Sequence, residues 1–546
     1  MDSCVKELGG VPSLFVNGEP TAANAYITYY AEKSRCADFA AAGYKLYSVP
    51  VYFAGITIND MGQIPPFTKG IFDDETPGFS VVDRHIRAIL AVCPDALIFP
   101  RVNMSLPRRW EKVNPDELCD FGFTENKRPC FSSEKWLEAT REYLEIFVEH
   151  IENSDYRENI VGYQIADGNT EEWFPYDMRG SVGARSREKC AGMSDYEEFR
   201  YYSETVADAI ISLAETVKEL TGGRRVVGAF YGYTVEVTDR RMCHHALRQV
   251  LECESVDFIC SPLSYEENRR VGIDHACMVP VDSLKLHGKL YFSENDTRTH
   301  LTNPPCDLPH YNSSVWQPRD RGECLEILKM HYARALCHGH ALWWFDMWGG
   351  WFNDAEFMGN LGNFLKITES SLAKNRGSVS EVAVFIDETA YAYISDGSDH
   401  FVYPSRRALG LTGAPYDIYL TSDFEAVYKN YKCFVFVAPR VTALTENAVK
   451  AAGDKPYITV TPENADISAA EFRELLRKAG AHIYCDTDSV VYASQSYVFI
   501  HTCKSGRLNL NAGGDLRLLV PREMDLCGDI PAYTSLLFER ITDNEE

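Results

Sequence analysis

The chain has 546 residues, which is enough for two or three domains if one of them is a large α/β barrel. Its hydrophobic fraction of 45% and charged fraction of 24% are those of a globular protein and exclude extended disorder or collagen-like repeats. The balance of 54 Lys and Arg against 79 Asp and Glu gives a formal charge of −25, which excludes nucleic acid or an anionic membrane as the main partner because phosphate binding requires a basic face.

Targeting and redox signals are weak throughout the chain. The first 20 residues contain no apolar run of signal-peptide length, and no window of about 18 apolar residues predicts a membrane span. The 17 cysteines form no CxxC pair, which is typical of reduced thiols that pack as small hydrophobic groups. Cys243, His244 and His245 are adjacent, but no second ligand pair has zinc-site spacing. We therefore expect a cytoplasmic protein with no membrane partner, no metal and no other cofactor.

The first 375 residues alternate between strand-like and helix-like patterns. Buried strands are predicted at residues 24–29, 45–53, 96–102, 160–166, 225–231, 257–261, 289–293 and 341–345. Helices with an apolar face are predicted at residues 81–92, 133–151, 195–220 and 324–337, the second beginning at Ser132 or Ser133 and the third ending at Gly222. Eight strands, each followed by a helix, predict a (β/α)8 barrel. The alternative, a doubly wound open sheet, lacks a Gly-rich phosphate-binding turn after its first strand, so we favour the barrel.

Two smaller units are predicted beyond the barrel. Strands at residues 381–386, 416–421, 433–437 and 457–460, with helices at 446–452 and 469–479, indicate a parallel α/β domain. Short strands at residues 490–494, 497–501, 506–511, 516–519 and 535–540 indicate a small antiparallel β domain. The predicted organisation is therefore a barrel over residues 1–376, an α/β domain over 377–485 and a β domain over 486–546.

Acidic residues follow two of the predicted barrel strands at the end where barrel active sites lie. The fourth strand is followed by Glu171 and Glu172, and the seventh by Glu294. Glycosidic cleavage needs two carboxyl groups on opposite sides of the bond, one that protonates the leaving oxygen and one that attacks the anomeric carbon or activates water. The layout therefore favours a glycoside hydrolase.

Polar and aromatic residues near the same strand ends suit recognition of a sugar. Aromatic rings offer a flat apolar surface to the C–H face of a pyranose, and buried polar groups bind its hydroxyls. From Trp344 and Trp348 we expect one ring to face the pocket, and Tyr265 either to hydrogen-bond the nucleophile or to pack. The candidate substrate-binding residues are Arg101, Asn103, Asn169, Trp173, Tyr265, Asn295, Trp344, Asp346 and Trp348. The segments 54–80 and 297–321 are expected to wall the pocket.

Glutamates after strands four and seven characterise the clan A glycoside hydrolases, and the chain resembles them. The order of barrel, α/β domain and small β domain is similar to that of glycoside hydrolase family 42, which consists chiefly of β-galactosidases. Residues 414–423 and 431–436 are similar to the trimerisation domain of that family. Glycoside hydrolase family 164, which includes β-mannosidases, has a similar three-domain trimeric plan. The resemblance implies a homotrimer that acts on a small glycoside or oligosaccharide.

One position departs from the clan A pattern. The clan places an Asn directly before the acid/base Glu, whereas this chain has Glu171 before Glu172. We prefer Glu172 as the acid/base because an aromatic residue, Trp173, follows it as in family 42, and Glu171 remains the alternative. Glu294 is the predicted nucleophile, with Asp296 as its competitor.

The resulting expectation is a retaining exo-β-glycosidase that hydrolyses terminal β-linked hexosides, like a β-galactosidase or a β-mannosidase. Two alternatives stay open from the sequence. The altered Asn-Glu pair is compatible with a catalytically silent carbohydrate-binding protein on the same scaffold. A carboxylate separation of about 7 Å or more would indicate inversion instead of retention.

Overall fold

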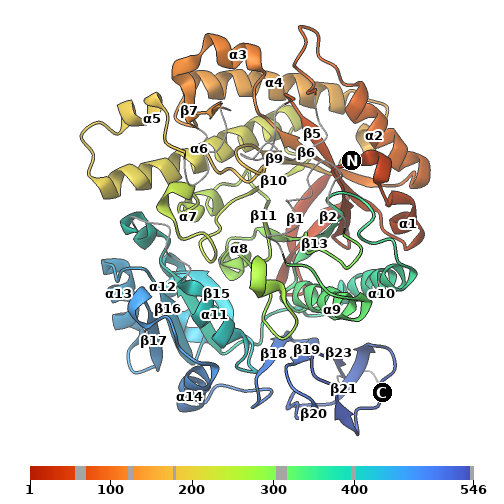
Figure 1. Cartoon of the computed structure of the whole chain (residues 1–546), viewed down its shortest axis with the longest axis vertical. Coiled ribbons are helices and arrows are strands. Elements are labelled where there is room, and N and C mark those ends of the chain that lie inside the picture. The colour runs from red at the N-terminus through yellow and green to blue at the C-terminus, as the bar shows by residue number, and fades with distance from the viewer. Residues whose placement is uncertain (56–68, 121–126, 176–179, 303–315, 395–400, 542–546) are drawn as a thin grey trace.

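The computed structural model describes residues 1–55, 69–120, 127–175, 180–302, 316–394 and 401–541. Eight parallel strands close into a barrel in the order β10-β11-β12-β13-β4-β5-β6-β9 (Figure 1). Their bounds are β4 (Asn24–Ile27), β5 (Leu46–Tyr52), β6 (Leu97–Asn103), β9 (Gly162–Ala166), β10 (Val226–Phe230), β11 (Phe258–Pro262), β12 (Leu290–Asn295) and β13 (Ala341–Phe345). Each of the eight predicted strands is present, so the predicted (β/α)8 barrel is confirmed.

Helices follow the strands and surround the barrel (Figure 1). In chain order they are α1 (Cys36–Ala41), α2 (Ser80–Val92), α3 (Arg108–Val113), α4 (Glu134–Glu152), α5 (Ala184–Lys189), α6 (Asp195–Thr221), α7 (Leu247–Leu251), α8 (Val281–Leu286), α9 (Arg321–His338) and α10 (Ala355–Ser371). The Ser133 side chain caps α4 by accepting a hydrogen bond from the Trp136 amide, and Gly222 ends α6 with a left-handed φ of 59°. Both predicted helix boundaries are therefore confirmed.

Aromatic side chains fill the inside of the barrel. The rings of Phe99, Phe258 and Phe292 contact one another with centroids 5.2–5.7 Å apart, and Trp343 stacks on Phe292 at 5.0 Å. Space for this cluster comes from Gly228 in β10, where a Cβ atom would lie 2.2 Å from the Phe258 ring. The barrel therefore has a packed floor rather than a pore, as barrels of this type do.

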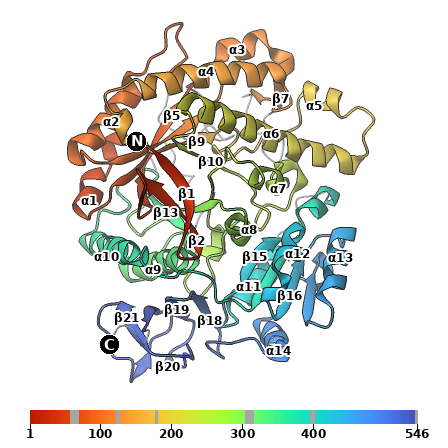
Figure 2. The same ribbon diagram turned by 180° about the vertical axis from the view of Figure 1, so that it is seen from behind.

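An N-terminal hairpin that the sequence analysis did not predict covers the other end of the barrel. Strands β1 (Ser3–Leu8) and β2 (Val11–Val16) pair around Gly9 and Gly10, which have φ of 59° and 80°, and the short β3 (Glu19–Pro20) follows (Figure 2). The Ser3 amide donates to the Arg224 carbonyl, just before β10, at 2.9 Å. The hairpin thus closes the end of the barrel from which the strands start.

A second sheet follows the barrel in the chain. Its order is β15-β14-β16-β17, all parallel, with bounds β14 (Val382–Ile386), β15 (Asp417–Leu420), β16 (Cys433–Val437) and β17 (Tyr457–Val460). The helices beside it are α11 (Val402–Gly410), α12 (Phe424–Val427), α13 (Ala443–Ala452) and α14 (Ala469–Ala479). We call residues 382–479 the second α/β unit. Its four strands and the helices α13 and α14 agree with the prediction, whereas α11 was not predicted.

The last sheet is antiparallel, with the order β18-β19-β23-β21. Its strands are β18 (Ser489–Ala493), β19 (Tyr497–Thr502), β21 (Leu516–Val520) and β23 (Ser535–Arg540). The strand predicted at residues 506–511 is wrong in length: only β20 (Gly506–Arg507) forms, and it pairs with β22 (Asp529–Ile530) outside the sheet. Strands β18, β19 and β23 contact helix α9 of the barrel, which fixes this sheet below it (Figure 2).

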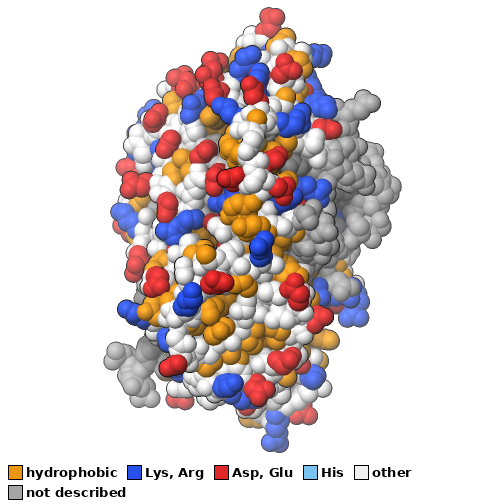
Figure 3. All heavy atoms as spheres, turned by 90° about the vertical axis from the view of Figure 1, so that its left-hand side faces the viewer, with side chains coloured by type: hydrophobic (Ala, Val, Ile, Leu, Met, Phe, Trp, Pro, Cys, Tyr) orange, Lys and Arg blue, Asp and Glu red, His pale blue; other side chains and the backbone are white. Residues whose placement is uncertain are grey.

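Charged side chains of both signs lie on the surface. On the side shown in Figure 3, acidic and basic side chains are interspersed among small hydrophobic patches. Across the described part of the chain, no helix is both long enough and apolar enough to cross a bilayer.

Candidate active site

The predicted acidic residues meet at the end of the barrel where the strands finish. Glu294 lies near the end of β12, and Glu171 and Glu172 lie in the loop after β9. Strands β9 and β12 are three places apart around the ring, so these side chains approach one another across the barrel mouth. Glu172 and Glu294, which are 122 residues apart in the chain, therefore share one site.

Glu294 is buried and held by two nitrogen donors. Its Oε2 accepts a hydrogen bond from Arg101 Nη2 at 2.5 Å and one from Trp343 Nε1 at 3.0 Å. Trp343 reaches it because it pairs with Glu294 in the register of β12 and β13. Burial and the nearby Asp296 carboxylate raise the pKa of Glu294, while Arg101 opposes the rise. Donors on one oxygen fix the orientation of the carboxylate and leave Oε1 to face a reacting carbon.

Arg101 connects Glu294 to Glu171. Its Nη2 contacts Glu294, and its Nη1 lies 3.6 Å from Glu171 Oε2. The side chain is 1% exposed, and its guanidinium carbon lies 4.8 Å from the centre of the Phe230 ring and 5.2 Å from that of Phe345. A cation enclosed by aromatic faces and two carboxylates is compensated in charge, which a buried ion requires.

The loop after β9 has an unusual backbone. Thr170, Glu171 and Trp173 have positive φ angles of 54°, 70° and 62°, a conformation that is uncommon for residues other than glycine. The Trp173 amide donates to the Asp167 carbonyl at 2.8 Å, which holds the turn closed. This backbone turns adjacent residues in different directions, and strain of this kind concentrates at functional sites.

Glu171 and Glu172 consequently have different surroundings. Glu171 is fully buried, and its Oε2 accepts from Tyr29 at 2.9 Å in addition to its ion pair with Arg101. Glu172 is half-buried, and its Oε1 accepts from the Tyr233 hydroxyl at 2.8 Å. The Thr170 hydroxyl donates to its other oxygen. Among the described residues, the donors to the Glu172 side chain are therefore neutral, whereas Glu171 is bound to a cation.

Burial, together with the negative charges of Glu294 and Asp296, raises the pKa of Glu172 to about 8. The hydroxyls of Thr170 and Tyr233 lower the pKa and so moderate this rise. At neutral pH Glu172 therefore holds a proton. A protonated carboxyl group facing an ionised one is the pairing that glycosidic bond cleavage requires.

Asp296, the competitor for the nucleophile, is fully engaged. Its Oδ2 accepts from the Tyr265 hydroxyl at 2.8 Å, and its Oδ1 accepts from Arg269 Nη2 at 2.6 Å. Tyr265 was expected either to bond the nucleophile or to pack, and it bonds Asp296 instead. Because both oxygens of Asp296 are occupied, we retain Glu294 as the candidate nucleophile.

Three buried amide groups near the ends of the barrel strands have an unused polar atom. Asn103 Nδ2, Gln164 Nε2 and Asn295 Oδ1 have no hydrogen-bond partner within the described residues. Asn103 ends β6, Gln164 lies in β9 and Asn295 ends β12. Asn103 and Gln164 lie on the same face of their strands as Arg101, whereas Asn295 pairs with Trp344 and shares its outward face. Buried polar atoms are normally paired, so the two inward donors, Asn103 Nδ2 and Gln164 Nε2, fit the hydroxyls of a bound sugar.

Three predicted substrate-binding residues lie elsewhere, and their assignment needs correction. Trp173 turns into the core, where its Nε1 donates to the Ile165 carbonyl at 3.2 Å. Trp344 donates to the Tyr44 hydroxyl at 2.9 Å on the outside of the barrel, because neighbouring residues of a strand face opposite ways. Asp346 accepts from the Tyr26 hydroxyl and from the amides of Gly350 and Trp351. It therefore closes the turn after β13, and none of the three belongs to the sugar site that we propose.

Two further candidates stay close to the site. Asn169 is half-buried in the β9 loop, where its amide donates to the Phe174 carbonyl at 2.8 Å. Trp348 is 2% exposed, lies edge-on to Trp351 at 5.5 Å and has the Arg298 guanidinium 5.2 Å from its ring centre. These contacts do not show whether Asn169 or Trp348 would lie against a bound sugar, so their assignment as substrate-binding residues stays a prediction.

Sequence reasoning missed several residues that contact the glutamates, and three of them are aromatic residues at the barrel mouth. Tyr29 follows β4, Tyr233 follows β10 and Trp343 lies in β13. Tyr29 ends a predicted strand, Tyr233 follows one and Trp343 lies within one, but polarity alone did not separate them from core aromatic residues. Trp343 is identified only by the strand register of the structure, because the residue paired with Glu294 faces the same side as Glu294.

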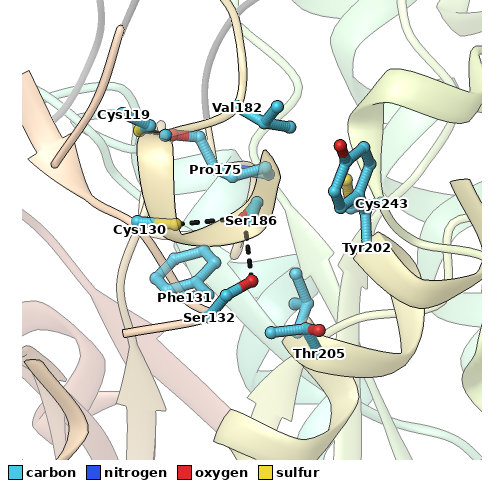
Figure 4. Close-up of a pocket in the computed structure, with 12 residues that line it drawn as sticks. Cys119, Cys130, Phe131, Ser132, Pro175, Val182, Ser186, Tyr202, Thr205 and Cys243 are labelled. Atoms are coloured by element: carbon cyan, nitrogen blue, oxygen red, sulfur yellow. Dashed lines mark hydrogen bonds between the residues drawn. The ribbon is translucent and has the colours of Figure 1, made fainter. Parts of the chain in front are cut away.

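A separate small cavity lies between α5, α6 and the hairpin of β7 (Leu118–Asp120) and β8 (Lys127–Pro129) (Figure 4). Its volume is about 20 Å³, room for about one water molecule. Cys130 and Ser132 both hydrogen-bond the Ser186 hydroxyl there, at 3.0 and 2.8 Å. A sugar ring does not fit this space.

Residues 56–68 and 303–315, from the two segments expected to wall the active site, lie outside the described residues.

Comparison with known proteins gives matches in structure alone. No family model matches the chain, and no curated protein matches its sequence. The crystal structure of a β-galactosidase from the psychrophilic Marinomonas ef1 aligns over 95% of this chain and 100% of its own, with a TM-score of 0.63 and 11% identity. This chain has the fold of that β-galactosidase.

Two further solved structures extend the comparison. A β-galactosidase from Bacillus circulans sp. alkalophilus aligns over 95% of this chain and 98% of its own, with a TM-score of 0.60 and 11% identity. An α-L-fucosidase isoenzyme 2 from Paenibacillus thiaminolyticus aligns over 80% of this chain and 64% of its own, with a TM-score of 0.51 and 12% identity. The resemblance to β-galactosidases expected from the sequence thus extends to the fold of nearly the whole chain.

Proposed function

We propose that the protein is a glycoside hydrolase that cleaves terminal β-linked hexosides by a retaining, two-carboxylate mechanism. The observation that carries this proposal is the convergence of Glu172 and Glu294, one protonated at neutral pH and the other bound to Arg101. The fold shared with solved β-galactosidases supports the same conclusion.

Each carboxyl group has a distinct role in the proposed reaction. Glu294 attacks the anomeric carbon, the bond to the leaving oxygen breaks, and the Glu172 proton moves to that oxygen. Glu172, now ionised, removes a proton from water, which attacks the anomeric carbon and releases the sugar and Glu294. Esterification of Glu294 removes a negative charge near Glu172 and so lowers the Glu172 pKa for this second step.

A panel of nitrophenyl β-glycosides tests the activity and the sugar preference together. We expect release of nitrophenol from a β-galactoside or a β-mannoside by the wild-type protein. A protein that only binds carbohydrate would release none and would show thermal stabilisation by sugars alone. The anomeric configuration of the first-formed product, followed by NMR, separates retention from inversion.

Loss of either carboxyl group tests the site assignment. We expect Glu294→Ala and Glu172→Ala each to lower kcat by at least about three decades, a size typical of such groups. The kcat of each variant is measured with the best substrate of the panel. Activity within tenfold of wild type in either variant would contradict the assignment.

The oligomeric state and location belong to the same proposal. We propose a cytoplasmic homotrimer assembled through the second α/β unit, by similarity to the family 42 plan. The chain mass of 61.7 kDa predicts a particle of about three times this mass in light scattering after size exclusion. A particle of single-chain mass would contradict the trimer and leave the proposed chemistry unaffected.

A further inference from the structure

Two loops beside the active-site carboxylates rest on the second α/β unit. We define the β10 loop as residues 231–246 and the β11 loop as residues 263–269. Helix α11 of the second α/β unit lies against both, and its Arg406 is 8% exposed. A buried cation at the contact between two units calls for a physical account, because an ion of this kind is stable only when it is fully paired.

Arg406 binds both loops through one guanidinium group. Its Nη1 donates to the Val235 carbonyl at 2.6 Å and to Glu236 Oε2 at 2.9 Å, both in the β10 loop. Its Nη2 donates to the Ser264 hydroxyl in the β11 loop at 2.5 Å. Since the guanidinium is planar and rigid, these bonds fix the distance between the two loops.

Glu236 completes the junction. Its Oε1 accepts from the Tyr403 hydroxyl at 2.7 Å and from the Tyr265 amide at 3.4 Å. Tyr403 belongs to α11, and the Arg406 guanidinium lies 4.9 Å from the centre of its ring. The β10 loop carboxylate is thus bound by α11 and by the β11 loop at once.

Each loop in turn holds one side of the candidate active site. In the β10 loop, Tyr233 donates to Glu172 Oε1 at 2.8 Å, and His244 Nε2 bonds the Glu172 carbonyl at 2.8 Å. In the β11 loop, Tyr265 and Arg269 bind Asp296, whose charge acts on Glu294. A displacement of one loop against the other therefore moves Glu172 relative to Asp296, which lies two residues beyond Glu294 and whose charge acts on it.

We propose that Arg406 is a positioning residue, through which the second α/β unit sets the placement of Glu172 against Glu294. This inference rests on the proposed function for its catalytic consequence. Arg406 contacts neither carboxylate and acts only through Tyr233, Tyr265 and the loops that carry them. The second α/β unit thus forms part of the active-site framework.

Substitution of Arg406, with a matched control, tests this role. In the whole chain we compare Arg406→Met and Arg406→Lys with Arg473→Met. Arg473 is 9% exposed in α14 of the same unit, and it binds the Leu411 carbonyl and Asp488, away from both loops. The control removes an equally buried arginine and leaves the active-site loops in place.

The expected effect of R406M is on kcat more than on KM. Misplacement of catalytic groups costs about 10- to 100-fold, so we expect a kcat loss in that range with KM changed by less than about threefold. The alkaline limb of the kcat/KM profile should move to lower pH, because a loosened site admits water to Glu172. Hydrogen exchange should rise in both loops. R406K should fall between R406M and wild type, and R473M should match wild type in kcat and loop exchange.

The outcomes separate this proposal from the proposed function. A folded R406M with wild-type kcat and an unchanged alkaline limb would overturn the positioning role of Arg406. A loss of kcat in R473M as large as that in R406M would overturn it as well. If the wild-type protein hydrolyses no glycoside, the proposed function fails. Hydrogen exchange then tests the link by itself, and unchanged exchange in R406M would overturn it. Should R406M not fold, Tyr403→Phe removes one hydroxyl from Glu236, and unchanged kcat and loop exchange in that variant would overturn the proposal.

Discussion

Adjacent glutamates with different partners illustrate how much single residues depend on their surroundings. Glu171 is bound to Arg101 and the Tyr29 hydroxyl, whereas the Glu172 side chain accepts from the hydroxyls of Thr170 and Tyr233 within the described part of the chain. The strained loop after β9 produces this division by pointing neighbours in different directions. The difference supports Glu172 as the acid/base, because the Arg101 charge opposes the rise in pKa that burial causes at Glu171, whereas hydroxyl groups oppose the rise at Glu172.

The pH dependence of the reaction follows from these surroundings. Catalysis needs Glu172 protonated, and its pKa is raised to about 8, so kcat/KM should fall as pH rises through about 8. It also needs Glu294 ionised, so kcat/KM should fall on the acid side at a pH above the ordinary Glu range. Initial rates between pH 4 and 10, with buffers of constant ionic strength, measure both limbs. If the fall at alkaline pH persists unchanged in Glu172→Gln, that fall belongs to another group.

Glu171→Gln separates the two adjacent glutamates. If Glu172 is the acid/base, Gln at 171 keeps the loop and removes only the partner charge of Arg101. We expect a loss in kcat/KM of about 10- to 100-fold, well below the loss in Glu172→Gln, since a buried ion pair is broken while the proton donor remains. A dinitrophenyl glycoside, whose leaving group needs no proton, should restore the first chemical step in Glu172→Gln only. Restoration in Glu171→Gln instead would exchange the two roles.

Strand elements place their residues by alternation and register. In β13, Trp343 points inward to Glu294 and the next residue, Trp344, points outward to Tyr44. The sequence shows two adjacent tryptophans and does not say which one faces the site. Only the pairing of Trp343 with Glu294 in the neighbouring strand resolves the choice.

Packing inside the barrel predicts a strong effect at Gly228 of β10. Gly228→Ala would place a Cβ atom 2.2 Å from the buried Phe258 ring, so we expect a loss of about 1–3 kcal/mol in the free energy of unfolding. Gly359→Ala is the matched control, because Gly359 is exposed in α10 with no atom within 4 Å of its would-be Cβ. It should gain up to about 1 kcal/mol from helix propensity. Denaturant unfolding measures both, and equal stabilities would contradict the packing argument.

At the scale of the whole molecule, buried histidines join the barrel to the last sheet. His331 of α9 bonds His275 Nδ1 through its Nε2 at 2.9 Å, and His501 of β19 accepts from the Gly272 amide at 2.9 Å. Burial lowers the pKa of His275 to about 4, that of His501 to about 3, and that of His331 well below its ordinary value. These histidines are therefore neutral in the folded protein.

Acid should weaken the molecule through these residues. A histidine with a lowered folded pKa contributes stability that is complete above its unfolded pKa of about 6.5 and is lost as pH falls toward the folded value. We expect the melting temperature to fall steadily between pH 6.5 and 4. In His331→Gln, which can still donate to His275, the fall should be shallower, because unfolding then takes up about one proton fewer. An identical pH slope in wild type and variant would rule out His331 as a contributor.

The sequence by itself determined the order of the eight barrel strands and the positions of the acidic residues after the fourth and seventh of them. Strand and helix periods, with caps such as Ser133 and Gly222, are local properties, so the eight barrel strands and the Glu294 position followed from them. Tertiary structure decided which side chains meet. Three contacts depend on distances between segments that are far apart in the chain. They are the contacts of Arg101 with Glu171 and Glu294, of Trp343 with Glu294, and of Arg406 with two barrel loops. Such distances arise from packing and strand register, which no local pattern encodes.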